Sequence, residues 1–113
     1  MSYEIVFGPE IQRNVKAFQK RYRHVDDDVQ AAVDQLVATP LLGDAIPNGE
    51  GTRKLRVRNS DLRKGKSAGY RLIYYVQVEP HPVIYLLLLY AKSDRSDVTL
   101  QELKTLLQEA GLL

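Results

Sequence analysis

Residues 70–91 read YRLIYYVQVEPHPVIYLLLLYA, and this stretch predicts the centre of a β-sheet. Its first part, Tyr70 to Val78, is rich in tyrosine, isoleucine and valine, which favour strands. The sequence PHP at residues 80–82 predicts a turn. Val83 to Ala91 is a continuous apolar run, as expected for a strand that is buried in the centre of a sheet.

The segment before this stretch predicts a third strand, from Arg53 to Arg58. Its residues alternate: Leu55 and Val57 point to one face, whereas Lys54, Arg56 and Arg58 point to the other. Residues 59–68 contain Gly65 and predict a turn. Three successive strands joined by short turns indicate an antiparallel meander.

The N-terminal part predicts a short strand, Tyr3 to Phe7, and then two helices. Apolar side chains recur four, three and four residues apart in the first helix, at Ile11, Val15, Phe18 and Tyr22. The second helix begins after His24 with three aspartates that complement the helix dipole, and it ends at Thr39, before Pro40. We expect a helical hairpin, followed by a loop over residues 41–51.

The last helix has a clear beginning and end. Thr99 and Glu102 form a capping box, and Gly111 stops the helix. The predicted order is β-α-α-β-β-β-α, an α+β fold whose helices pack on one face of the sheet. We expect one domain over residues 1–113, because the chain has the usual length of one domain.

Composition excludes several classes of protein. The chain is 44% hydrophobic and 27% charged, which is typical of a globular domain, and it has no cysteine for disulfides, thiolate chemistry or thiolate metal ligands. The two histidines are far apart and nothing near the three aspartates completes a ligand set, so the sequence predicts no metal and no cofactor. The first residues do not resemble a signal peptide, and the longest apolar run is too short for a membrane span. We therefore expect a cytoplasmic protein with no membrane partner.

The basic residues are concentrated in one segment. Residues 51–71 hold eight basic residues against one acid, Asp61, although the whole chain has a net charge of only +2. The eight are Arg53, Lys54, Arg56, Arg58, Arg63, Lys64, Lys66 and Arg71. Such an excess attracts polyanions, and a solvated charged strand and loop is the alternative. A second basic stripe on the first helix is more typical of a solvated helix face.

The basic strand and its neighbours suggest phosphate chemistry on RNA. Tyr90 and Lys92 are two residues apart and share a face. Cations can bind backbone phosphate and can stabilise a pentacoordinate phosphorane. RNA carries its own nucleophile, the 2′-OH, so a metal-free ribonuclease needs only a base, an acid and charge stabilisation. A lysine within a cluster of cations is a plausible acid–base group.

Three other features of the sequence each support a function only weakly. The tyrosines at positions 74, 75, 85 and 90 can stack on bases or can pack in the core. The sequence GKS at residues 65–67 is similar to the end of a P-loop, but the earlier glycine is missing. A Ser-His-Asp triad is disfavoured by the positions of His24 and His81.

Several stretches resemble the RelE-type toxins of bacterial toxin–antitoxin pairs, and among them the HigB-like branch. They are PLLGD at residues 40–44, RKLRV at 53–57, GKSAGYRLIYY at 65–75 and YAKSD at 90–94. The resemblance implies a small α+β fold with a curved, mainly antiparallel sheet. It also implies a metal-free endoribonuclease that cuts mRNA in the ribosomal A site by 2′-OH attack. The implied partners are an antitoxin and, through the toxin–antitoxin complex, operator DNA.

The resemblance also implies roles for individual residues. Arg71 matches the family's arginine at the scissile phosphate. Lys54 and Arg56 match its paired basic residues, and Lys92 matches the cation at the end of the last strand. The remaining cations of the basic segment are expected to bind RNA, namely Arg53, Arg58, Arg63, Lys64 and Lys66.

Two positions depart from the family pattern. Ser93 stands where some members have an arginine, and Thr99 stands where some have a tyrosine that stacks on the substrate. Lys66 and Tyr90 are the candidates to replace them. Two alternatives share the fold: a ParE-like poison of DNA gyrase, which does not need the cationic face, and a non-catalytic basic domain that binds RNA or an antitoxin.

Overall fold

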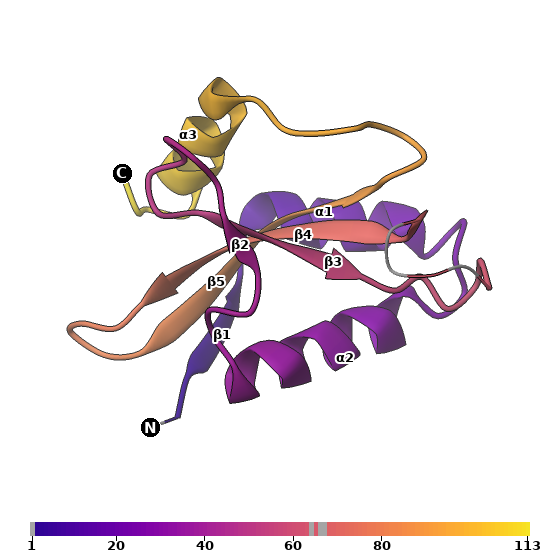
Figure 1. Ribbon diagram of the computed structural model, residues 1–113, viewed down its shortest axis with the longest axis horizontal. Coiled ribbons are helices and arrows are strands. Elements are labelled where there is room, and N and C mark those ends of the chain that lie inside the picture. The colour runs from indigo at the N-terminus through magenta and orange to yellow at the C-terminus, as the bar shows by residue number, and fades with distance from the viewer. Residues whose placement is uncertain (1, 64, 66–67) are drawn as a thin grey trace.

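The computed structural model describes residues 2–63, 65 and 68–113 of the 113-residue chain. It consists of one mixed sheet with helices on both sides (Figure 1). The elements are β1 (Glu4–Phe7), α1 (Pro9–Phe18), α2 (Val25–Ala38), β2 (Asp44–Ala45), β3 (Arg53–Val57), β4 (Tyr70–Gln77), β5 (Val83–Ala91) and α3 (Leu100–Glu109).

The strand order in the sheet is β1-β5-β4-β3-β2. The pairs β2–β3, β3–β4 and β4–β5 are antiparallel, which confirms the predicted meander, and β1 pairs with β5 in parallel. The strand in the middle is therefore β4 and not β5. β5 is nevertheless buried except at the half-buried Tyr85, because strands flank it on both edges and helices cover both faces. This double burial explains its continuous apolar sequence.

The prediction of a loop over residues 41–51 was wrong in one respect, because this segment contains the two-residue strand β2. Asp44 pairs with Lys54, and Ala45 pairs with Arg53. The first helix also ends earlier than its apolar stripe predicts. Tyr22 lies beyond α1, yet it still packs against the rings of Phe18 and Tyr70.

The helices pack on both faces of the sheet, which corrects the expectation that they share one. Ile11 and Phe18 of α1, together with the apolar face of α2, pack on one side. Leu103, Leu106 and Leu107 of α3 pack on the other side (Figure 1). The connection from β5 to α3 runs over the same side as α3. We call this side the α3 face.

α3 begins and ends as its sequence predicts. The Thr99 hydroxyl accepts a hydrogen bond from the Glu102 backbone N–H, and the Glu102 side chain accepts one from the Thr99 N–H. Gly111 has a positive φ of 75°, which favours glycine at the end of a helix.

A close approach of backbones at Gly69 holds β3 and β4 together. A Cβ atom at this position would lie 2.3 Å from the Val57 carbonyl oxygen and 2.8 Å from the Asn59 nitrogen. Both atoms belong to the backbone and cannot rotate away. The Gly69 carbonyl also accepts a hydrogen bond from the Lys92 N–H, at 2.9 Å. Glycine at this position therefore lets the end of β3 and the end of β5 both approach the chain just before β4.

We expect Gly69→Ala to lower the free energy of unfolding by about 1–3 kcal/mol, the usual cost of forcing an extra methyl group into a packed site. Urea denaturation followed by circular dichroism measures this value. Gly65→Ala is the matched control, because a Cβ there would meet no described atom within 4 Å. Equal stability of the two variants would contradict the prediction.

Candidate functional site

Pairing in the sheet brings three of the predicted site residues into one row. Arg56 on β3 is the partner of Arg71 on β4, and Arg71 is the partner of Tyr90 on β5. Lys54 lies in a neighbouring row, opposite Ile73. Ile73 and Tyr90 pack on the α3 face, so the four predicted residues share that face. We call Lys54, Arg56 and Arg71 the cationic cluster.

An irregularity in β5 sets the direction of Tyr90. Tyr74 pairs with Leu86, but Ile73 pairs with Leu88, so Leu87 is an extra residue in β5. Before this bulge, Leu86 packs on the side of the sheet that α1 and α2 cover. After the bulge, Leu88 and Tyr90 pack on the α3 face. If β5 alternated regularly from Leu86 onwards, Tyr90 would lie on the same face as Leu86 and point away from Arg71.

Arg71 is a cation in an unfavourable position for its charge. Its side chain is buried, with 7% of the residue exposed, and one terminal nitrogen donates to the Tyr70 carbonyl at 3.2 Å. Burial lowers the pKa of Arg71, and the charge of Arg56 lowers it further. An arginine remains protonated at neutral pH in spite of such a shift. A bound anion would therefore stabilise this group more than it would stabilise an exposed arginine.

Tyr90 presents a protonated hydroxyl beside the cluster. The residue is 4% exposed, and among the described residues its hydroxyl has no hydrogen-bond partner. Burial raises the pKa of Tyr90, although the charges of Lys54, Arg71 and Arg95 partly oppose this effect. The Arg95 guanidinium lies over the ring, 5.0 Å from its centre. At neutral pH the phenol is thus a proton donor and not a base.

The connection between β5 and α3 contacts Lys54 of the cluster, which sequence reasoning did not predict. One carboxylate oxygen of Asp97 lies 2.9 Å from the Lys54 ammonium group. Lys92 follows β5 and is exposed, and its ammonium group donates to the Ser96 carbonyl at 3.1 Å. No spacing in the sequence indicates that Asp97 pairs with a residue so far away along the chain.

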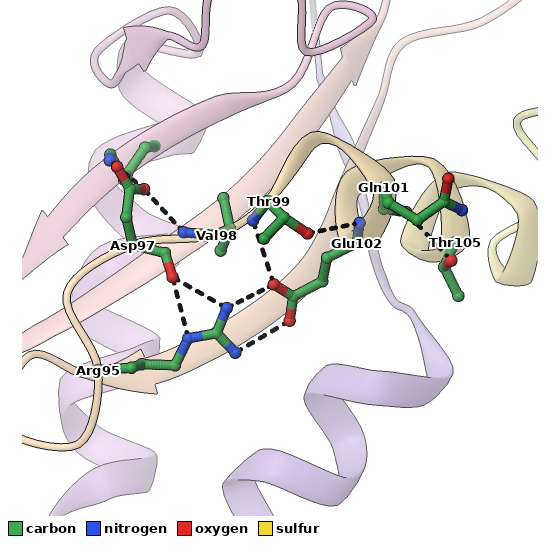
Figure 2. Close-up of polar contacts among 8 residues, drawn as sticks. Arg95, Asp97, Val98, Thr99, Gln101, Glu102 and Thr105 are labelled. Atoms are coloured by element: carbon green, nitrogen blue, oxygen red, sulfur yellow. Dashed lines mark hydrogen bonds and ion pairs between the residues drawn. The ribbon is translucent and has the colours of Figure 1, made fainter.

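Arg95 fixes this connection to the beginning of α3. Its guanidinium forms a two-pronged ion pair with Glu102, one contact of which is 2.9 Å, and it donates twice to the Asp97 carbonyl, at 3.1 and 3.0 Å (Figure 2). The capping box identified Glu102 in the sequence only as a helix-capping residue. In the structure it caps α3 and also anchors Arg95.

The Glu102 ion pair makes stability dependent on pH. Its hydrogen bonds with Arg95 lower the pKa of Glu102 below the ordinary value of 4.5, against the opposing effect of burial. A lowered folded-state pKa adds stability above the unfolded-state pKa, and this stability is lost as the pH falls through the folded value. We expect Glu102→Gln to be less stable than the wild type at neutral pH. The difference should shrink below about pH 4.5.

Urea denaturation at a series of pH values measures this difference. Glu109→Gln on the same helix is the control, because Glu109 is exposed and its nearest cation, Arg13, is 3.7 Å away. A Glu102→Gln deficit that stays constant from neutral to acid pH would show that the carboxylate charge is not the source of the stability.

The structure does not bring every predicted RNA-binding residue to the α3 face. Arg53 is the β3 partner of Tyr74, which packs on the opposite face, and it donates to the carbonyls of Gly43 and Leu41 at 3.0 and 3.2 Å. Arg58 and Arg63 are exposed beyond the end of β3. Lys64 and Lys66 lie outside the described residues.

Two hollows lie along β3. One of about 350 Å³ is lined by Gly43, Asp44, Lys54 and Arg56. The other, of about 370 Å³, is lined by Arg56, Arg58 and residues of α2. Arg56 borders both hollows.

The described part of the chain contains no group of three metal-ligating side chains that could hold an ion. No helix within it is long and apolar enough to cross a membrane.

No protein-family model matches the chain. In structure, the chain is similar to the E. coli toxin RelE, solved in the free state as a mutant with two arginines replaced by alanine. The TM-score is 0.57 at 19% sequence identity, and the match covers 98% of this chain and 96% of that one. The chain therefore has a RelE-like α+β fold over nearly its whole length, which confirms the predicted fold.

Proposed function

We propose that this RelE-like chain is the toxin of a type II toxin–antitoxin pair and cuts messenger RNA on the ribosome. The observation that carries the proposal is the row formed by Arg56, Arg71 and Tyr90, with Lys54 in a neighbouring row. A fold shared with RelE does not by itself require charged side chains on this face. Their convergence there supports a site for phosphate.

The row fits cleavage by transesterification. The RNA 2′-oxygen attacks the adjacent phosphorus, a new O–P bond forms, and the bond to the 5′-oxygen breaks. The products are a 2′,3′-cyclic phosphate and a 5′-hydroxyl. Arg71 and Arg56 would stabilise the added negative charge on the phosphorane. Tyr90 would protonate the leaving 5′-oxygen, and Lys54 is the candidate to accept the proton that the attacking 2′-hydroxyl loses.

The proposal includes the partners of such toxins. An antitoxin would neutralise the protein in the cytoplasm, and the complex would bind operator DNA. Exposed apolar side chains support a protein partner: Val37 on the last turn of α2, followed by Leu41 and Leu42, are each at least 44% exposed. An antitoxin segment that covers them would remove this apolar area from water.

A non-catalytic basic domain is the second candidate, and two observations favour it. Lys54 is already paired with Asp97. Thr99 is the N-cap of α3, so it provides no aromatic ring for a base. Under this hypothesis the cationic cluster would bind RNA without cutting it.

The test is induction of the protein in a bacterium that lacks an antitoxin, with primer extension on an mRNA that is being translated. The same mRNA without its start codon is the control, because a ribosome-dependent enzyme would leave it intact. Growth arrest with new cuts inside translated codons is the expected result. Arrest without cuts would indicate another target such as DNA gyrase, and normal growth would favour the non-catalytic domain.

A further inference from the structure

Residues 95–98, which we call the strap, hold one carboxylate against the cationic cluster. Arg95 donates two hydrogen bonds to the Asp97 carbonyl, and the Asp97 carboxylate accepts the Val98 N–H at 2.8 Å. The same carboxylate oxygen lies 2.9 Å from the Lys54 ammonium group. Asp97 is thus fixed by its own loop in contact with the cluster.

The carboxylate of Asp97 takes a place that a phosphate oxygen would need. A carboxylate and a phosphate bind a lysine in the same way, through an anionic oxygen. Asp97 is 63% exposed and Lys54 is 30% exposed, so solvent and ligands reach this ion pair. Exposed pairs of this kind are weak and can exchange partners.

The closed strap also leaves one polar group unsatisfied. Arg95 lies over the Tyr90 ring, and the buried hydroxyl of Tyr90 has no hydrogen-bond partner among the described residues. A buried hydroxyl without a partner is unfavourable. A ligand rich in oxygen atoms would supply the missing acceptor once the strap moved. In this arrangement the Lys54 ammonium group has an anionic partner, whereas the Tyr90 hydroxyl has no hydrogen-bond partner among the described residues.

We propose that the strap is an autoinhibitory contact, in which Asp97 holds Lys54 until a phosphate of single-stranded RNA displaces it. The choice of RNA as the polyanion rests on the proposed function, but the contact itself does not require cleavage. Removing the Asp97 charge should free Lys54 for RNA and leave the fold intact, because Arg95 contacts the backbone of Asp97 and not its carboxylate.

The experiment measures the affinity of a short fluorescein-labelled oligouridylate by fluorescence anisotropy over a range of salt concentrations. We expect Asp97→Asn to bind about two- to fivefold more tightly than the wild type, as expected for release of an exposed ion pair. The plot of log affinity against log salt should steepen by up to about 0.7, the value for one more phosphate contact on a single strand.

Asp94→Asn is the matched control. Asp94 lies in the same connection, and Asp94→Asn changes the net charge by the same amount, but the partner of Asp94 is Arg21 in the turn after α1, at 2.7 Å. We expect it to alter affinity less than twofold. A second test repeats Asp97→Asn in a Lys54→Met background, where the gain should disappear because no lysine remains to be released.

Three results would overturn autoinhibition: equal affinities of Asp97→Asn and Asp94→Asn, weaker binding by Asp97→Asn, or a gain that persists without Lys54. Absence of RNA binding by the wild type and by Asp97→Asn would overturn both this inference and RNA recognition by the cluster. Tighter binding by Asp97→Asn, in a protein that never cuts translated mRNA, would support the inference and overturn only the nuclease. Melting curves of each variant confirm that it is folded.

Discussion

Replacing Arg71 with glutamine is expected to lower cleavage within translated codons by about 100- to 1,000-fold, the usual cost of removing one group that stabilises transition-state charge. Arg71 lies between Arg56 and Tyr90 in the row across the sheet. Its burial makes its interaction with an anion stronger than that of an exposed cation. Glutamine keeps a polar side chain of similar reach but removes the charge.

Arg71→Gln is expected to leave the free energy of unfolding unchanged or to raise it. The lowered pKa of Arg71 shows that the fold disfavours its charge, because the side chain is buried near Arg56. Urea denaturation and primer extension on one protein preparation therefore separate the two effects. Arg13→Gln is the control, since Arg13 is exposed on α1 and pairs with Glu10. Full cleavage by a folded Arg71→Gln protein would exclude Arg71 from the reaction.

The order of the main helices and strands could be predicted because these elements depend on local patterns. The alternation of Leu55 and Val57 with Lys54 and Arg56 determines which side of β3 is charged, and the structure follows it. The position of α3 could not be predicted in the same way. Its leucine stripe shows that one side of the helix is apolar but does not indicate which face of the sheet it covers.

The candidate site was foreseeable only in part, for two physical reasons. The bulge at Leu87 lies in a run of four leucines, where an extra residue interrupts no pattern, yet it turns Tyr90 towards Arg71. The contact of Asp97 with Lys54 joins residues 43 positions apart, and an isolated aspartate in a loop carries no local signal. By contrast, the alternation already places Arg53 on the side of Leu55, away from the cluster.

Replacing Tyr90 with phenylalanine is expected to lower cleavage by about 100-fold or more, as for loss of a general acid. The ring and its contact with Arg95 would remain, and only the hydroxyl would be lost. Burial keeps this hydroxyl protonated at neutral pH, so it can supply a proton to the leaving oxygen. Stability should not fall, because the hydroxyl makes no hydrogen bond with the described residues.

Tyr70→Phe is a closely matched control for this experiment. The Tyr70 hydroxyl is also buried without a partner among the described residues, and burial raises its pKa, but its ring packs with Phe18 and Tyr22 on the opposite face of the sheet. We expect Tyr70→Phe to cut translated mRNA as the wild type does. Loss of cleavage in both variants would mean that the hydroxyls act through the fold. Full cleavage by Tyr90→Phe would mean that Tyr90 only packs in the core, so another group would supply the proton to the leaving oxygen.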